Sequence, residues 1–384
     1  MRIQKWLSIL FFFGTIAVFA LLTLVLPKQS FSENENRTLT SFPTIRSVED
    51  IMDRSFMKGF DNYISDHFAG RDQWIALKTQ LDLLYGQKEV SGVYITPERL
   101  MQKTDTPNEQ YINASINAIN EYAQKYPDKT VSVLLVPTAT EIYKEQLPKN
   151  APELDQKLLI DSVYSQLTDS IVRLDAYRPL MAEKNNYIFY KTDHHWTSYG
   201  AFVTYSYNAR SLGFNPLSLN DFQIEHASYN FLGTLHSKTQ YTKTGMDTID
   251  LYTNAGNVQV VSCIRNNGVE QTEYPSIFFR EMLEKKDQYS VFLGTNEGIV
   301  TVKTNASNGK RLLMFKDSYS HALIQFLAPH YEEITLVDLR YLTTSYETYV
   351  DPALYDQVMF LYNVNSFITD SYIKNVTWSI QDQS

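Results

Sequence analysis

The stretch Tyr-Ile-Phe-Tyr-Lys-Thr-Asp-His-His-Trp-Thr, residues 187–197, places a short apolar run directly before a helical pattern. The run at residues 187–190 predicts a strand, so a carboxylate, two imidazoles and an indole gather on one strand-to-helix turn. Loops held by rigid elements are where binding and catalytic residues concentrate. By itself the cluster is ambiguous, because one Asp and two adjacent His residues suit a metal site, a shaped binding site or an oriented base.

Around this turn, buried strand patterns alternate with helical patterns, which is typical of an α/β protein with a parallel sheet. Continuous apolar runs predict strands at residues 131–136, 171–174, 311–315, 333–337 and 358–362. Apolar residues at helical spacing predict flanking helices that begin near 106, 153, 201 and 320. Residues 216–304 differ, because short β-prone runs are separated there by Asn and Gly, and they predict a largely β insertion.

The N-terminal region contains an uncharged apolar run at residues 7–26, which is 20 residues long and therefore matches a membrane-spanning helix. Arg2 and Lys5 precede the run, so the positive-inside rule predicts a cytoplasmic N-terminus and an extracytoplasmic remainder in a single-pass protein of the cell membrane. A cleaved signal peptide has a shorter apolar region, so we favour an uncleaved anchor. The predicted organisation is a cytoplasmic stub and anchor, a tether with a helical base, and an α/β domain, at residues 1–27, 28–90 and 91–384.

Composition limits the partners of the chain. The formal net charge of −9 argues against nucleic acid or another anionic polymer as a generic electrostatic partner. Cys263 is the only cysteine of the sequence, which excludes an intrachain disulfide and a cysteine-based zinc knuckle. The 27 tyrosines suit a surface that contacts carbohydrate or protein, although a tyrosine-rich core explains them equally well.

A second segment, Phe-Lys-Asp-Ser-Tyr at residues 315–319, ends a predicted strand and starts a helix at once. Ser318 is therefore expected at the carboxyl edge of the sheet, where open α/β folds bind ligands and where backbone N–H groups of the new helix can stabilise an oxyanion. A nucleophilic serine needs a base and an orienting acid, and His195 and Asp193 can supply both. Helix capping by Ser318 or Asp317 is the simpler interpretation of the segment alone. The joint occurrence of two turns at strand ends favours catalysis.

The metal interpretation keeps Asp193, His194 and His195 as ligands. Adjacent residues on a short turn rarely converge on one ion, and no spacing of the H-E-x-x-H type occurs. We therefore expect neither a metal nor a cofactor.

Asp193-His194-His195-Trp196 resembles the signature of the bacterial DHHW protein family. That family is similar to the alginate O-acetylation proteins of the SGNH hydrolase-like superfamily. The resemblance implies an SGNH hydrolase-like sheet with Ser318 as nucleophile, His195 as base and Asp193 as its orienter. Further segments that resemble the family lie at residues 32–37, 66–71, 315–319 and 337–341.

One residue departs from the superfamily pattern. Lys316 stands where that pattern has Gly, and Gly adopts backbone conformations that Lys resists. The turn before Ser318 is therefore expected to differ from that of the superfamily.

The function implied by this resemblance is acyl transfer, with acetyl as the first candidate, onto or off hydroxyls of a cell-surface polysaccharide. Both a transferase and an esterase fit. Because acetyl-CoA is cytoplasmic, a transferase outside the cell needs a membrane partner that delivers the acyl group, and the resemblance implies a membrane-bound O-acyltransferase in that role. Candidate substrate-binding residues are His194, Trp196, Tyr319 and Arg340, for which packing or a surface ion pair is the alternative. The rival function is a catalytically silent module that binds polysaccharide or scaffolds its modification and export.

Overall fold

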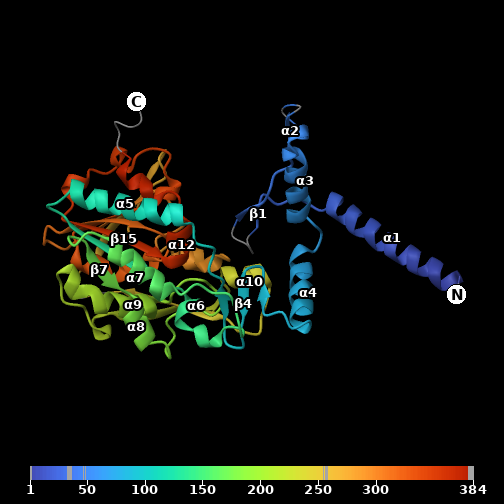
Figure 1. Cartoon of the computed structure of the whole chain (residues 1–384), viewed down its shortest axis with the longest axis horizontal. Helices are drawn as coiled ribbons and strands as arrows, with labels where there is room; N and C mark the ends of the chain where they lie inside the picture. The colour runs from blue at the N-terminus through green and yellow to red at the C-terminus, as the bar shows by residue number, and fades with distance from the viewer. Residues whose placement is uncertain are drawn as a thin grey trace. The chain divides into compact units, whose positions relative to one another are not determined.

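The computed structural model describes residues 2–32, 37–45, 47, 49–253, 255 and 258–378. The chain forms two compact units, which Figure 1 shows coloured along the sequence. The first unit consists of Met1–Ser91 and His236–Thr242, and the second consists of Gly92–Leu235 and Lys243–Ser384. A short segment of the predicted insertion thus belongs to the N-terminal unit.

The first unit is largely helical. Its helix α1, Arg2–Val25, contains a stretch, Ile3–Val25, that is long and apolar enough to cross a membrane. The turn between α3 and α4 contains Gly70 with a φ of +70°, within the stretch at 66–71 that resembles the family. Of the other such stretch, at 32–37, residues 33–36 lie outside the described residues. The remaining elements are β1 Phe31–Ser32, β2 Arg37–Thr38, α2 Glu49–Met52, α3 Ser55–Asp66, α4 Arg71–Leu84 and β3 Glu89–Val90.

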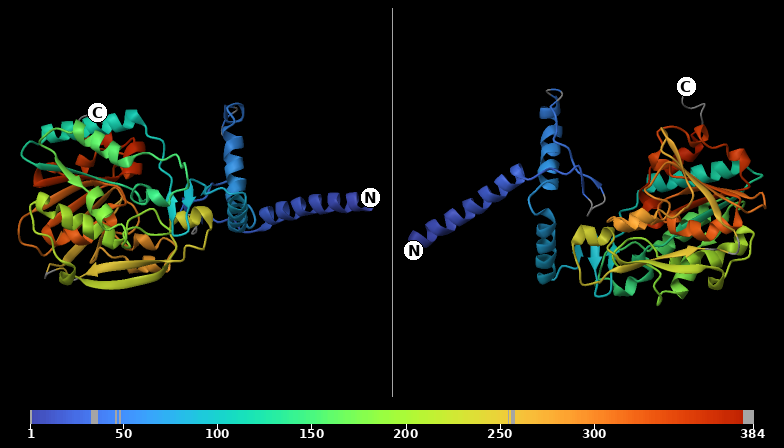
Figure 2. Two further views of the ribbon diagram at one scale, coloured as in Figure 1. Left: turned by 60° about the horizontal axis from the view of Figure 1, so that its bottom comes forward. Right: turned by 180° about the vertical axis from the view of Figure 1, so that it is seen from behind.

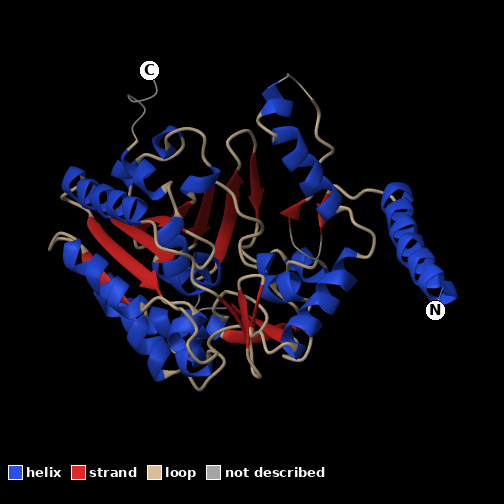
Figure 3. Cartoon of the chain, turned by 45° about the vertical axis from the view of Figure 1, so that its right-hand side comes forward, coloured by secondary structure: helices blue, strands red, loops and turns tan. Residues whose placement is uncertain are grey.

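The second unit is built on an eight-stranded sheet with the order β11-β10-β12-β14-β13-β15-β6-β7. The strands from β14 to β7 are parallel to one another, whereas β12, β10 and β11 continue the sheet in antiparallel fashion. Figure 3 shows these strands in red. Their bounds are β6 Thr130–Val136, β7 Val172–Asp175, β10 Val260–Asn266, β11 Gln271–Tyr274, β12 Ile299–Thr304, β13 Arg311–Lys316, β14 Glu333–Val337 and β15 Gln357–Asn363.

Both faces of the parallel part are covered by helices, which confirms the predicted α/β class. Along β13, Leu312 and Met314 enter one apolar core and Leu313 and Phe315 enter the other. This two-sided burial explains why the strand is a continuous apolar run. In Figure 1, α5 lies on one side of the sheet and α8 and α9 lie on the other. The helices of this unit are α5 Glu109–Lys125, α6 Ala139–Ile142, α7 Gln156–Gln166, α8 Tyr177–Ala182, α9 Ser198–Asn208, α11 Ser320–Leu327 and α12 Val364–Thr369, whereas most of α10, Thr234–Thr239, belongs to the first unit.

The insertion at about 216–304 is rich in strands, but it does not form a lobe of its own. Its strands β10 to β12 extend the main sheet, whereas β8, Gln223–Phe231, and β9, Asp247–Thr253, form an antiparallel ribbon. One of the short β-prone runs of the insertion, at residues 289–293, is helical instead, in a 3-10 turn at Gln288–Val291. The positive φ of Leu293 and Gly294 bends the chain there, which an extended strand does not allow. A small hairpin, β4 Val93–Ile95 and β5 Leu100–Gln102, precedes α5.

Candidate active site

The turn that carries Ser318 lies between the end of β13 and the start of α11. Asp317 holds this turn: its Oδ1 accepts from the Tyr319 N–H at 2.9 Å, and its Oδ2 accepts from the backbone and side-chain nitrogens of Asn363, both at 2.7 Å. Asp317 is fully buried, and Ser318 is half-buried between buried neighbours. The helix α11 begins without a side-chain cap hydrogen bond, so neither Ser318 nor Asp317 caps it, and Asp317 instead holds the turn before it.

The loop that carries His195 is not preceded by a strand. Residues 187–190, predicted as a strand, make a single bridge between Phe189 and Trp196 and otherwise form a loop. Their apolar side chains are buried by tertiary packing, since Phe189 and Tyr190 are fully buried in the core. The helix α9 begins after this loop, where the Thr197 hydroxyl accepts from the Gly200 N–H.

A buried carboxylate, Asp247 at the start of β9, fixes the loop. It accepts hydrogen bonds from the Lys191 N–H at 2.8 Å, from the Thr192 N–H at 2.8 Å and hydroxyl at 2.5 Å, and from the Tyr187 hydroxyl at 2.5 Å. These donors reduce the cost of burying the carboxylate, although burial still raises the pKa of Asp247 above its usual value. Asp247 belongs to the insertion, and no sequence motif identified it.

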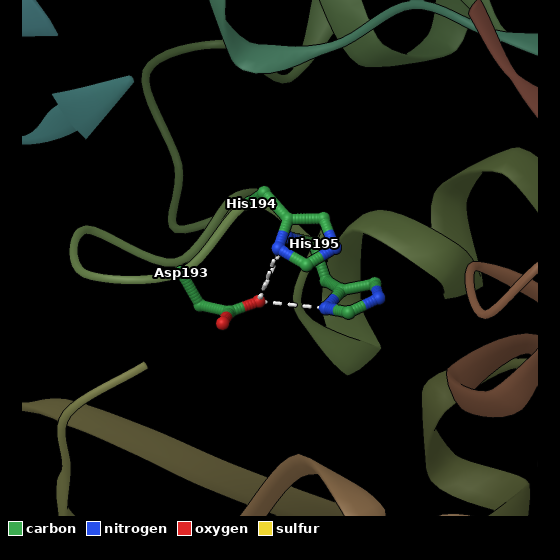
Figure 4. Close-up of side chains that lie close together, drawn as sticks. All are labelled: Asp193, His194 and His195. Carbon is green, nitrogen blue, oxygen red and sulfur yellow. Dashed lines mark hydrogen bonds and ion pairs between the residues drawn. The ribbon is translucent and has the colours of Figure 1, made fainter. Parts of the chain in front are cut away.

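Two hydrogen bonds join Asp193, His195 and Ser318 into a chain. His195 Nδ1 lies 2.6 Å from Asp193 Oδ1, and His195 Nε2 lies 2.7 Å from Ser318 Oγ. Figure 4 shows the carboxylate facing the near side of the His195 ring, whose other nitrogen points away from it. The structure therefore brings together the three residues that the sequence predicted as nucleophile, base and orienter, in the order that proton transfer requires.

The carboxylate of Asp193 is enclosed by residues of the insertion. Its Oδ2 accepts from the Thr234 N–H at 2.8 Å and from the Thr234 hydroxyl at 3.0 Å. A Cβ placed on Gly233 would overlap the Asp193 side chain, so this approach requires glycine. Burial alone would raise the pKa of Asp193, but the imidazoles of His194 and His195 and these hydrogen bonds hold that pKa well below its usual value. Asp193 is therefore a fixed negative charge behind His195.

Tyr289 is the main residue of the site that sequence reasoning missed. Its ring stacks on His195 with a centroid distance of 3.8 Å and an interplanar angle of 8°. Its hydroxyl donates to the backbone carbonyl of Ser318 at 3.1 Å. One side chain of the insertion thus contacts both the imidazole and the serine turn. In the sequence, Tyr289 is simply part of a short β-prone run, and nothing there indicates a contact with His195 or Ser318.

The aromatic candidates Trp196 and Tyr319 connect the two turns. Trp196 Nε1 donates to the Tyr319 carbonyl at 3.0 Å, and the Tyr319 hydroxyl donates to the His194 carbonyl at 2.5 Å. Both side chains are buried, so packing is the role that their geometry supports. The His194 ring is partly exposed and lies 2.8 Å from the Thr234 hydroxyl through Nδ1.

Arg340 makes a bidentate pair with Asp338, at 2.8 and 2.7 Å. Asp338 also lies 3.4 Å from the buried Lys316 Nζ, which in turn lies 2.9 Å from His321 Nε2. Burial lowers the pKa of Lys316 and that of His321. This geometry supports the ion-pair alternative for Arg340, and its role in substrate binding stays a prediction.

The ligand-type atoms of Asp193, His194 and His195 lie within 4.8 Å of one another, which is compatible with a metal ion. However, both ring nitrogens of His195 already face polar partners, Asp193 and Ser318. An ion between the carboxylate and the imidazole would displace the 2.6 Å contact. The arrangement therefore favours proton transfer over metal binding.

Comparison with known proteins finds a matching family and several similar structures. The family model described as DHHW protein matches residues 89–337. A crystal structure of a DHHW family protein from Eubacterium siraeum is 24% identical, with a TM-score of 0.64, over 75% of this chain and 95% of that one. A structure of Bacillus cereus PatB1 is 19% identical, with a TM-score of 0.62, and the match covers 73% of this chain and 98% of that one. A second PatB1 structure, with a sulfonyl adduct, is 18% identical, with a TM-score of 0.61, and its match covers 73% of this chain and 96% of that one. No curated protein matches the chain.

The contacts of Tyr289 predict a graded loss of stability. Tyr289→Phe keeps the stacked ring and removes one of the two donors to the Ser318 carbonyl, which still accepts from the His321 N–H, so we expect the free energy of unfolding to fall by about 0.5–1.5 kcal/mol. Tyr289→Leu also removes the stacking and should cost more. Urea unfolding of the full chain measures both, with the exposed Tyr207→Phe as control. Equal stability of Tyr289→Phe and wild type would contradict the role of the hydroxyl.

The depressed pKa of Asp193 predicts a pH dependence of stability. Because the unfolded chain binds this proton more readily, the stabilisation is present above about pH 4 and is lost as the pH falls below it. We expect the unfolding free energy of Asp193→Asn to decline less steeply in acid than that of wild type. Glu121→Gln, at an exposed position of α5, is the control. Parallel curves for wild type and Asp193→Asn would refute the assignment.

Proposed function

The chain belongs to the DHHW protein family, and we propose that it is an extracytoplasmic, membrane-anchored enzyme that moves an acyl group, acetyl in the first instance, onto or off hydroxyls of a cell-surface polysaccharide. The observation that carries this proposal is the chain of two hydrogen bonds from Asp193 through His195 to Ser318. Proteins use this arrangement to make a serine hydroxyl nucleophilic.

In the proposed reaction, Ser318 Oγ attacks the acyl carbonyl while His195 Nε2 accepts the hydroxyl proton. His195 then returns this proton to the leaving oxygen, and an acyl-serine remains. In the second half, His195 deprotonates the incoming sugar hydroxyl or water, which takes the acyl group and regenerates Ser318. The fixed charge of Asp193 stabilises the imidazolium in both halves.

The donor for the developing oxyanion differs from the sequence-based expectation. The N–H groups at the start of α11 are engaged within the turn, since those of Tyr319 and Ser320 bind Asp317 and that of His321 binds the Ser318 carbonyl. In the part of the chain that the structure describes, the N–H of Ser318 makes no hydrogen bond. We therefore assign the Ser318 N–H as one donor to the oxyanion.

The anchor and the partner follow from α1 and from the family resemblance. A membrane-spanning α1 with Arg2 and Lys5 on the cytoplasmic side leaves the site outside the cell. A transferase there receives its acyl group through a membrane-bound O-acyltransferase, as the resemblance implies, and passes it to polysaccharide. An esterase needs only water.

Acyl release tests the proposal directly. We expect the full chain to release acetate from an activated acetyl ester, and Ser318→Ala or His195→Ala to lower the rate by about 100-fold or more. Ser165→Ala, at an exposed serine of α7, should release acetate at the wild-type rate. Folded Ser318→Ala and His195→Ala variants that match wild type would exclude the relay and leave the catalytically silent module as the function.

Sulfonyl labelling identifies the nucleophile independently of the natural substrate. Ser318 Oγ should attack the sulfur of phenylmethylsulfonyl fluoride, with fluoride leaving and the proton passing to His195. Peptide mass spectrometry is expected to place the adduct on Ser318 in wild type and to find little of it in His195→Ala. Prior treatment with a chelator should not change the labelling. Labelling that is lost on chelation, or that falls on another serine, would contradict the assignment.

A further inference from the structure

The helix α4 of the first unit exposes an apolar face. Trp74, Leu77, Leu81 and Leu84 are 43%, 45%, 44% and 82% exposed. Their spacing of three or four residues places them on one side of the helix. On its inner side, the buried Thr79 hydroxyl donates to the Thr239 carbonyl at 2.7 Å within the same unit. The outer face therefore carries an apolar stripe on a helix that is already docked through its other face.

This stripe begins where α4 contacts α1. The ring of Phe19 lies 5.2 Å from that of Trp74 and 5.9 Å from that of Phe68. The Thr23 hydroxyl accepts from the Ala69 N–H at 3.1 Å, which fixes the level of this contact along α1. An apolar hollow of about 470 Å³ lies between α1 and the side chains of Ile64, Phe68 and Trp74.

The position of Phe19 along α1 sets the depth of the contact. Phe19 precedes the last residue of α1, Val25, by six residues, or about 9 Å. A helix of 24 residues is about 36 Å long, compared with about 30 Å for the hydrocarbon layer of a bilayer. Phe19 therefore lies inside the outer part of that layer if α1 spans it. Phe68 and Trp74, which touch Phe19, must reach the same depth.

We propose that α4 lies in the outer interface of the membrane, with the stripe of Trp74, Leu77, Leu81 and Leu84 toward the lipid acyl chains. This inference rests on the membrane-spanning α1 of the proposed function. Tryptophan prefers the level between headgroups and acyl chains, and an amphipathic helix lies in that plane. Figures 1 and 2 show α4 running across the direction of α1 rather than along it, as such a helix requires.

Site-directed fluorescence on the full chain tests the proposal. The natural Cys263 is buried, so a single introduced cysteine is the reactive position. Leu77→Cys and Leu81→Cys report on the stripe, Phe11→Cys reports on the middle of α1, and Asp61→Cys on an exposed part of α3 is the control. Each variant carries an environment-sensitive dye and is reconstituted in phosphatidylcholine vesicles with or without doxyl-labelled phosphatidylcholine.

We expect the doxyl lipid to lower the emission at positions 77, 81 and 11 by roughly twofold, and to leave that at position 61 nearly unchanged. Quenching at 11 without quenching at 77 and 81 would overturn the interfacial helix and keep the anchor. A blue-shifted but unquenched dye at 77 and 81 would mean that protein, such as a second copy, covers the stripe, and would also overturn it. Loss of quenching at 11 would refute the anchor as well, whereas acetate release reports separately on the catalytic proposal.

Discussion

Two hydrogen bonds from buried aromatic side chains hold the serine turn against the histidine loop, and a third ties the serine turn to the insertion; the geometry of the site depends on them. Trp196 and Tyr319 each donate to a carbonyl on the opposite turn, and Tyr289 donates to the carbonyl of Ser318. Separating the two turns would break the hydrogen bonds of Trp196 and Tyr319, which costs free energy, so both contacts oppose that separation. Ser318 and His195 are 123 positions apart in the chain, and these contacts keep them at 2.7 Å.

Lysine at position 316 is compatible with this geometry because of where the strand ends. Lys316 still pairs with Leu361 in the parallel ladder and is therefore extended, a conformation that needs no glycine. Its side chain runs into the buried group formed with Asp338 and His321. Lys316 therefore needs no unusual backbone conformation and places a buried charged group beneath the turn.

The parallel sheet was predictable because two-sided burial leaves continuous apolar runs, as in β13, β14 and β15. The same rule misled at residues 187–190, where Phe189 and Tyr190 are buried by packing and not by pairing. The three residues of the proposed relay lie together in the structure, and two short segments of sequence, at 193–196 and 315–319, had pointed to them. The residues that hold the relay in place could not be predicted. Asp247, Thr234 and Tyr289 are distant from it in sequence and contact it or the histidine loop only in the folded chain, and no motif surrounds them.

Those three supports show why the insertion matters for chemistry. The α/β sheet alone places Ser318 at a strand end, where many folds of this kind bind ligands. Orientation of the base comes from elsewhere, since Asp247 fixes the loop, Thr234 binds the carboxylate of Asp193, and Tyr289 covers the imidazole. Ser318, the proposed nucleophile, therefore follows a strand of the sheet, whereas His195, the proposed base, is held by the insertion. Activity should thus depend on a segment that contributes no residue to the relay itself.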